Sequence, residues 1–173
     1  TATTTEAAEP DLFIGKSNIT LKSDKMTPEA LWAMGRIGAS AASPDGKQVV
    51  YQVGYYSVEA NKSRQVLCLV NADGTSQHQL TNDKDSEAAP SWICNGQRIA
   101  FLSKGQLWSM KPDGTDRRAI TTEKDGEIAD YKFSPDGTQV ILVKTIPFHN
   151  IIKENPSDLP KATGRVITDL MYR

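Results

Sequence analysis

The chain has 173 residues, 38% of them hydrophobic, which is enough for one domain with a buried core. Its 20 Lys and Arg nearly balance its 21 Asp and Glu, and no run of like charge reaches five residues. This balance excludes the electrostatic footprint expected for binding nucleic acid or an acidic membrane surface. No apolar run is long enough to span a bilayer.

The first residues of the chain are small and polar and show no apolar periodicity. We therefore expect residues 1–25 to form a flexible N-terminal leader. Such a start is expected for an exported protein after removal of a signal peptide, and equally for a shortened chain.

A short helix is predicted over residues 28–34. Thr27 can cap its N-terminus, Pro28 suits the first helical position, Glu29 suits the first turn, and Gly35 can end it. Its apolar side consists of Leu31, Trp32 and Met34. We expect this side to pack on a neighbouring sheet or on a partner domain.

A strand-turn-strand element occurs three times, at residues 42–51, 92–101 and 133–142. The first and third copies contain Pro-Asp-Gly, and the second has Cys-Asn-Gly at the same place. Pro presets φ, Asp hydrogen-bonds its own backbone and Gly accepts positive φ, so the tripeptide predicts a tight turn.

A second repeat connects these copies. Residues 67–85 match residues 107–125 at a constant offset of 40 residues, and both contain Asp-Gly-Thr. Asp-Gly between apolar segments predicts a further hairpin. Four strands in a unit of about 40 residues indicate the blade of a β-propeller. Trp92, Trp108 and Phe133 fall at repeat positions, where we expect them to fill the core between blades.

The first blade departs from the second in the connection between its middle strands. Residues 54–65 are mostly polar, whereas the second blade has only residues 104–106 at this place. Two interpretations remain open: a long functional loop at one rim, or an extended hairpin that covers a neighbour.

The third copy is followed by residues 144–161, where three prolines predict a loop, and by residues 164–173, which look like the start of another ordered element. We predict an all-β fold: a partial β-propeller of about two and a half four-stranded blades, preceded by one short helix. Closed propellers need about four to eight blades, so residues 26–173 are expected to be part of a longer propeller.

The residues that could carry chemistry do not form a recognisable site. Cys68 and Cys94 are expected to be two small buried or half-buried residues, although a disulfide stays possible. His78 and His149 have no partner at ligand or triad spacing, so both are expected at the surface. Ser40 lacks the second glycine of a nucleophile elbow.

The acidic residues of the repeats could suggest a calcium-binding site, but their spacing does not support one. The Asp-Gly-Thr turns and residues 83–85 lack the alternating ligands and final Glu of a calcium loop. Asn18 and Asn61 begin glycosylation sequons, a motif that is common by chance. We therefore predict no catalytic residue, no cofactor-binding residue, no metal ligand and no cofactor for this chain.

The motifs together resemble a known family. Residues 26–32, 36–38 and 43–47 are similar to the start of the propeller domain in the prolyl oligopeptidase family of serine peptidases, closest to its bacterial dipeptidyl-peptidase and acylaminoacyl-peptidase branch. The resemblance covers residues 26–173. It implies an N-terminal propeller region whose parent carries a C-terminal hydrolase domain, absent here, with the catalytic triad.

The resemblance implies that this segment gates and shapes the substrate chamber of a peptidase that releases dipeptides or acylated residues from short peptides. Peptide substrate would then bind through the hydrolase domain, in a periplasmic or secreted protein. We expect neither nucleic acid nor membrane as a partner, and we leave a homodimer open. The alternative is a non-catalytic binding propeller that resembles the periplasmic Tol translocation protein. A polysaccharide lyase or glycosidase ranks last, because no paired carboxylates support it.

Overall fold

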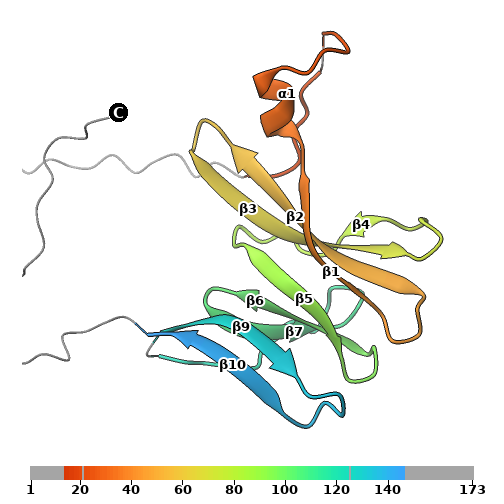
Figure 1. Ribbon diagram of the computed structural model, residues 1–173, viewed down its shortest axis with the longest axis vertical. Helices are drawn as coiled ribbons and strands as arrows, with labels where there is room; N and C mark the ends of the chain where they lie inside the picture. Colours follow the sequence, from red (N-terminus) through yellow and green to blue (C-terminus); the bar gives the residue numbers. More distant parts are fainter. Residues whose placement is uncertain (1–13, 21, 125, 147–173) are drawn as a thin grey trace, which may run out of the picture.

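The computed structural model describes residues 14–20, 22–124 and 126–146. These residues form three antiparallel sheets stacked side by side, with one short helix at the edge of the first sheet (Figure 1). The predicted all-β partial propeller with one leading helix is therefore confirmed. Most of the predicted leader and all of residues 164–173 lie outside the described residues.

The helix α1 (Pro28–Ala33) ends one residue before the predicted boundary. Thr27 is its N-cap, as predicted: the Thr27 hydroxyl accepts a hydrogen bond of 3.2 Å from the amide of Ala30. Ala30 is the helix's one buried residue. No helix in the described part of the chain is long and apolar enough to cross a membrane.

The first blade contains four strands in sequential order, β1 (Arg36–Ala42), β2 (Gln48–Ser57), β3 (Lys62–Asn71) and β4 (His78–Gln79). Strands β2 and β3 stay paired in continuous register over ten residues each. The structure therefore selects the extended hairpin over the loop for residues 54–65. A tight turn closes this hairpin between Ser57 and Lys62.

The second blade repeats this order with shorter middle strands. Its strands are β5 (Glu87–Ile93), β6 (Arg98–Ser103), β7 (Gln106–Met110) and β8 (Arg118–Ala119). Strand β5 packs on the first sheet, with contacts to β1, β2 and β3. Each blade therefore lays its innermost strand against the face of the preceding blade, as in a propeller.

The third sheet consists of β9 (Glu127–Phe133) and β10 (Val140–Thr145) within the described residues. Ile141 is 73% exposed and Val143 is 53% exposed, on the side away from the second blade. The counterparts of β10 in the two complete blades, β2 and β6, have only buried and half-buried residues. This apolar face is the kind of surface that a further blade covers in a propeller.

The three tight turns predicted to be alike differ in conformation. In the first turn the Ser43 hydroxyl donates to Asp45 at 2.6 Å, and in the third turn Ser134 donates to Asp136 at 2.5 Å. The second turn places Cys94 and Asn95 at φ of 51° and 53°. A proline at the position of Cys94 would forbid this conformation, because its ring fixes φ at about −65°.

The main core lies between the first two blades. It consists of buried side chains from β2, β3, β6 and β7: Val50, Leu67, Leu69, Ile99, Phe101 and Met110. Trp92 and Trp108 are partly buried and pack against it, as the repeat predicts. Phe133 is half-buried and meets Tyr131 edge to face, with ring centroids 5.8 Å apart.

Candidate functional site

The residues considered as nucleophiles or bases in the sequence lie apart from one another. Ser40 sits within β1 and is exposed, so it is not at a strand-to-helix turn. His78 is exposed in the outer strand β4, and its Nδ1 lies 2.8 Å from the carbonyl oxygen of Ser76. His149 lies outside the described residues. The structure brings together no nucleophile and base among these described residues.

The two cysteines have opposite environments. Both thiols are free, Cys68 is buried in β3, and Cys94 is exposed in the second tight turn. The prediction of a buried or half-buried residue is therefore wrong for Cys94, because the turn projects it into solvent. Burial raises the pKa of the Cys68 thiol. Within the described residues no group of three or more His, Cys, Asp or Glu could hold a metal ion.

The repeated aspartates accept hydrogen bonds from within their own turns. Asp73 accepts hydrogen bonds from the amide and the hydroxyl of Thr75, at 2.9 and 2.7 Å. Asp113 and Thr115 repeat both bonds at the same distances. The Thr75 hydroxyl lowers the pKa of Asp73, because its hydrogen bond favours the ionised carboxylate. The turn interpretation therefore accounts for these residues.

A buried carboxylate lies where the chain enters the second blade. Glu87 is 0% exposed at the start of β5. Its oxygens accept hydrogen bonds from the Thr81 hydroxyl and from Arg117, both at 3.1 Å. Arg117 also contacts the Asp83 carboxylate and the Ser103 hydroxyl. These hydrogen bonds tie the connection between the two blades to the outer part of the second blade.

Burial raises the pKa of Glu87, although its hydrogen bond from Arg117 opposes the shift. The Arg117 guanidinium also lies 4.9 Å from the ring centroid of Phe101 and 5.3 Å from that of Trp108. The sequence analysis missed this cluster. The sequence contains one sign of it: Glu87, at the start of an innermost strand, is repeated 40 residues later as Glu127.

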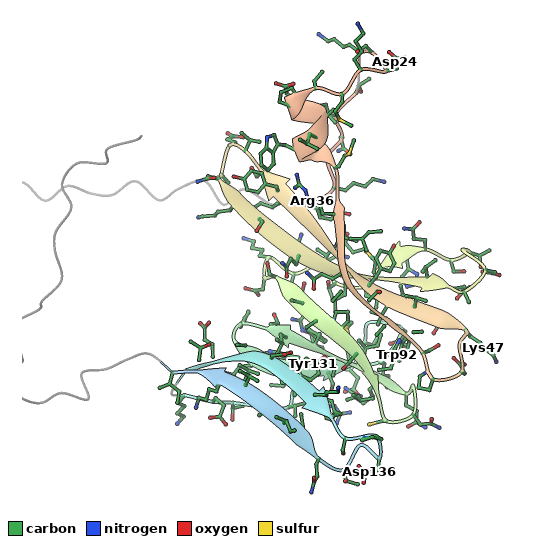
Figure 2. The ribbon with its side chains drawn as sticks, viewed as in Figure 1. Asp24, Arg36, Lys47, Trp92, Tyr131 and Asp136 are labelled. Carbon is green, nitrogen blue, oxygen red and sulfur yellow. The ribbon has the colours of Figure 1, made fainter. Side chains whose placement is uncertain are left out.

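A tyrosine from the third sheet bonds to the second blade. The Tyr131 hydroxyl lies 2.6 Å from the carbonyl oxygen of Ala89, 2.9 Å from that of Ala100, and 2.9 Å from the Ser91 hydroxyl (Figure 2). Burial raises the pKa of Tyr131 to about 12. Ala89 has a φ of 51° at a bulge in β5, and its amide donates to Gln52 of the first blade at 3.0 Å.

Two open hollows lie along the edge that carries the tight turns, which we call the turn rim: the turns at Gly46, Gly96 and Gly137. One, of about 320 Å³, lies between the first two blades and includes Trp92 and Asp45 in its lining. The other, of about 530 Å³, lies between the two turns of the first blade. Neither hollow is lined by a Ser, His and acid in a catalytic arrangement, so we assign no chemistry to them.

The opposite edge carries α1 and the turn between β2 and β3, and we call it the hairpin rim (Figure 1). The rings of Trp32 and Tyr56 lie 4.7 Å apart and join the helix to the hairpin. Arg36 begins β1 and lies 5.2 Å from the Trp32 ring centroid (Figure 2). The predicted packing of α1 on a sheet is thus made by Trp32, while Leu31 and Met34 remain exposed.

The stacking of four-stranded antiparallel blades defines the chain as part of a β-propeller. In sequence it is 44% identical to dipeptidyl-peptidase 5 of Porphyromonas endodontalis over 158 residues, or 89% of this chain. It is 47% identical to dipeptidyl-peptidase 5 of Porphyromonas gingivalis over 154 residues, or 87% of this chain. These identities confirm the resemblance to the propeller region of the prolyl oligopeptidase-family peptidases. No family model matches the chain.

The chain spans less than a quarter of the length of these relatives, 23% and 22%.

Solved structures share its fold at lower identity. An oligogalacturonate lyase in complex with manganese has a TM-score of 0.54 at 17% identity, with 66% of this chain and 36% of that chain covered. Pyrococcus horikoshii acylaminoacyl peptidase also has a TM-score of 0.54, at 16% identity, with 65% and 17% covered.

A TolB from Agrobacterium tumefaciens has a TM-score of 0.52 at 20% identity, with 68% of this chain and 40% of that chain covered. These three proteins have different names and share one fold. Their structural similarity therefore establishes the propeller architecture and does not discriminate among the functions considered from the sequence.

Proposed function

We propose that this chain is the propeller segment of a serine peptidase that releases dipeptides or acylated residues from short peptides. The observation that carries the proposal is the 44–47% sequence identity to two dipeptidyl-peptidases over nearly the whole chain. The resemblance assigns the catalytic triad to the hydrolase domain of the parent, and we propose no catalytic residue in this segment. Peptide substrate is the partner, and the protein is periplasmic or secreted.

The role of this segment is to shape and gate the substrate chamber. In a propeller the innermost strand of each blade faces the central channel. Strand β1 is the innermost strand of the first blade, and six of its seven residues are exposed. A channel wall of this kind, held by stacked blades, selects substrates by size and charge and takes no part in bond breaking.

The experiment compares two proteins on a dipeptidyl chromogenic substrate: the full polypeptide that contains this chain, and the chain expressed alone. We expect hydrolysis only by the full polypeptide, and inhibition of that hydrolysis by a serine-directed fluorophosphonate. Turnover by the isolated chain that survives further purification would contradict the assignment. A full polypeptide without peptidase activity that captures one stoichiometric envelope protein would favour the Tol-like alternative.

A further inference from the structure

Five dipeptides in the described part of the chain join an aspartate or asparagine to a glycine, and all five lie in turns. Such pairs are chemically labile. A glycine has no Cβ to shield its amide nitrogen, so the nitrogen can attack the side-chain carbonyl carbon of the residue before it. The residues that precede these glycines are four aspartates and one asparagine: Asp45, Asp73, Asp113, Asp136 and Asn95.

The four aspartates are protected from this reaction by hydrogen bonds within their turns. Each carboxylate accepts one bond from a hydroxyl of the same turn. Each also accepts one from the backbone amide two residues ahead, at 2.9 to 3.1 Å. These bonds, from the hydroxyl first, lower the pKa of all four carboxyl groups and keep them ionised. An ionised carboxylate is a poor target for a nucleophile, so these four sites are stable.

Asn95 has no such protection. Its turn has Ile93 at the position where the other two turns of the turn rim have serine, so the hydroxyl bond is missing. The Asn95 side chain is exposed, and no residue in the described part of the chain hydrogen-bonds it. The amide of Gly96 donates to the Ile93 carbonyl oxygen at 3.2 Å, whereas the corresponding glycines of the other two turns donate at 2.9 Å. The attacking nitrogen is therefore held weakly.

The backbone of this turn is also strained. Cys94, Asn95 and Gly96 have φ of 51°, 53° and 83°, so three successive residues lie in the left-handed region. This region is unfavourable for residues that carry a Cβ, which two of the three do. A strained turn with a long closing bond opens by local fluctuation, and opening frees the Gly96 nitrogen to approach the Asn95 side chain.

We propose that Asn95 is a site of spontaneous covalent modification, at which deamidation produces aspartate and isoaspartate. The Gly96 nitrogen forms a bond to Cγ of Asn95, the Cγ–Nδ2 bond breaks, and ammonia leaves with the proton of the Gly96 amide. Water then opens the resulting succinimide ring at one of its two carbonyl carbons. The reaction needs only water, and the inference does not depend on the proposed function.

The modification alters the contact between the first two blades. Asn95 lines the hollow of about 320 Å³ between them, together with Asp45 and Trp92. A carboxylate at position 95 places a second negative charge in the hollow that already contains Asp45, and like charges repel. Isoaspartate also adds a methylene group to the backbone of the turn, beside the pair of Ile93 and Arg98 that ends the β5–β6 ladder.

The test follows the masses of two tryptic peptides from the full polypeptide that contains this chain, incubated at mildly alkaline pH. Residues 85–98 form one peptide, in which Asn95 is the only asparagine. Residues 65–84 form the internal control, with Asn71 and Asn82. Both control asparagines make side-chain hydrogen bonds, and neither precedes glycine. An unincubated sample, digested in parallel, corrects for deamidation during digestion.

We expect the peptide of residues 85–98 to gain about 1 Da at least tenfold faster than the control peptide, because only its asparagine is unprotected. The product should accept a methyl group from a protein isoaspartyl methyltransferase. The variant N95Q should lose the mass gain, since glutamine must form a larger ring, which closes slowly. Equal rates in the two peptides, or a gain that persists in N95Q, would overturn the inference.

A denatured sample of the same polypeptide completes the experiment, because it shows that the reaction is detectable under these conditions. A native peptide of residues 85–98 that stays unchanged while its denatured counterpart deamidates would show that the folded turn protects Asn95. That result would overturn the inference too. Faster modification of the native peptide than of the control peptide, with both modified in denaturant, would support it.

Discussion

Removal of the Tyr131 hydroxyl tests whether the third sheet is joined to the second blade by specific bonds. Tyr131→Phe preserves the ring and its edge contact with Phe133. It removes the group that lies within 2.9 Å of the Ala89 and Ala100 carbonyl oxygens and the Ser91 hydroxyl. A buried polar group that loses its partner costs about 1–3 kcal/mol, so the free energy of unfolding should fall by roughly that amount.

The assay is urea denaturation followed by near-UV circular dichroism. With a urea slope of about 1–3 kcal/mol/M, the expected loss moves the midpoint down by roughly 1 M. Tyr56→Phe is the matched control, because the Tyr56 hydroxyl bonds Asn61 at the surface, at 2.5 Å. We expect the control to stay within about 0.5 kcal/mol of the unmodified chain. Equal effects of the two substitutions would refute the proposed bond between the sheets.

Three further predictions address the core, a turn and the thiols. Leu67→Ala should lower the free energy of unfolding by about 2–5 kcal/mol, because Leu67 is 0% exposed between the first two blades; Leu31→Ala, at an exposed position, should change that of the isolated chain by less than about 0.5 kcal/mol. In denaturation curves, similar losses for both would place Leu67 outside the core. Thr75→Val should raise the pKa of Asp73 toward its ordinary value, since the Thr75 hydroxyl is the largest cause of its lowering. The stability contributed by ionised Asp73 is present above its ordinary pKa and lost as the pH falls through its folded pKa, so the variant should lose less stability on acidification. The chemical shifts of the carboxyl carbons, followed against pH by NMR, report the pKa of Asp73 and of Asp113. An equal rise in the pKa of Asp113 would contradict a local cause. A thiol reagent should modify Cys94 in the native chain and Cys68 only after unfolding, so two rapidly modified native thiols would contradict the burial of Cys68.

The sequence repeats predicted the strands and their order well, and the reason is local. Pro-Asp-Gly and Asp-Gly-Thr encode turns through the φ preferences and side-chain bonds of three adjacent residues. The structure contains hairpin turns at all these positions. The positive φ of Cys94 and Asn95 was not predicted, because the repeat aligned this glycine with those of the other turns although the turn lacks their proline.

The buried polar contacts were harder to predict, because they join residues that are far apart in the sequence. Glu87 and Arg117 are 30 residues apart, and Tyr131 bonds to Ala89 across 42 residues. No sequence window relates such residues. The extended β2–β3 hairpin was one of two open interpretations, since polar residues such as those between Gly54 and Gln65 suit a solvent-exposed strand as well as a loop.

The sequence by itself determined the blade: its period of about 40 residues, its tight turns and its capped leading helix, all properties of residues close together in the chain. Only the tertiary structure decided which apolar side chains are buried. Leu67 in β3 and Leu31 in α1 are the same residue type, yet one is 0% and the other 47% exposed. Burial depends on whether a second surface lies opposite, and the second blade covers Leu67 whereas no described residue covers Leu31 to the same extent.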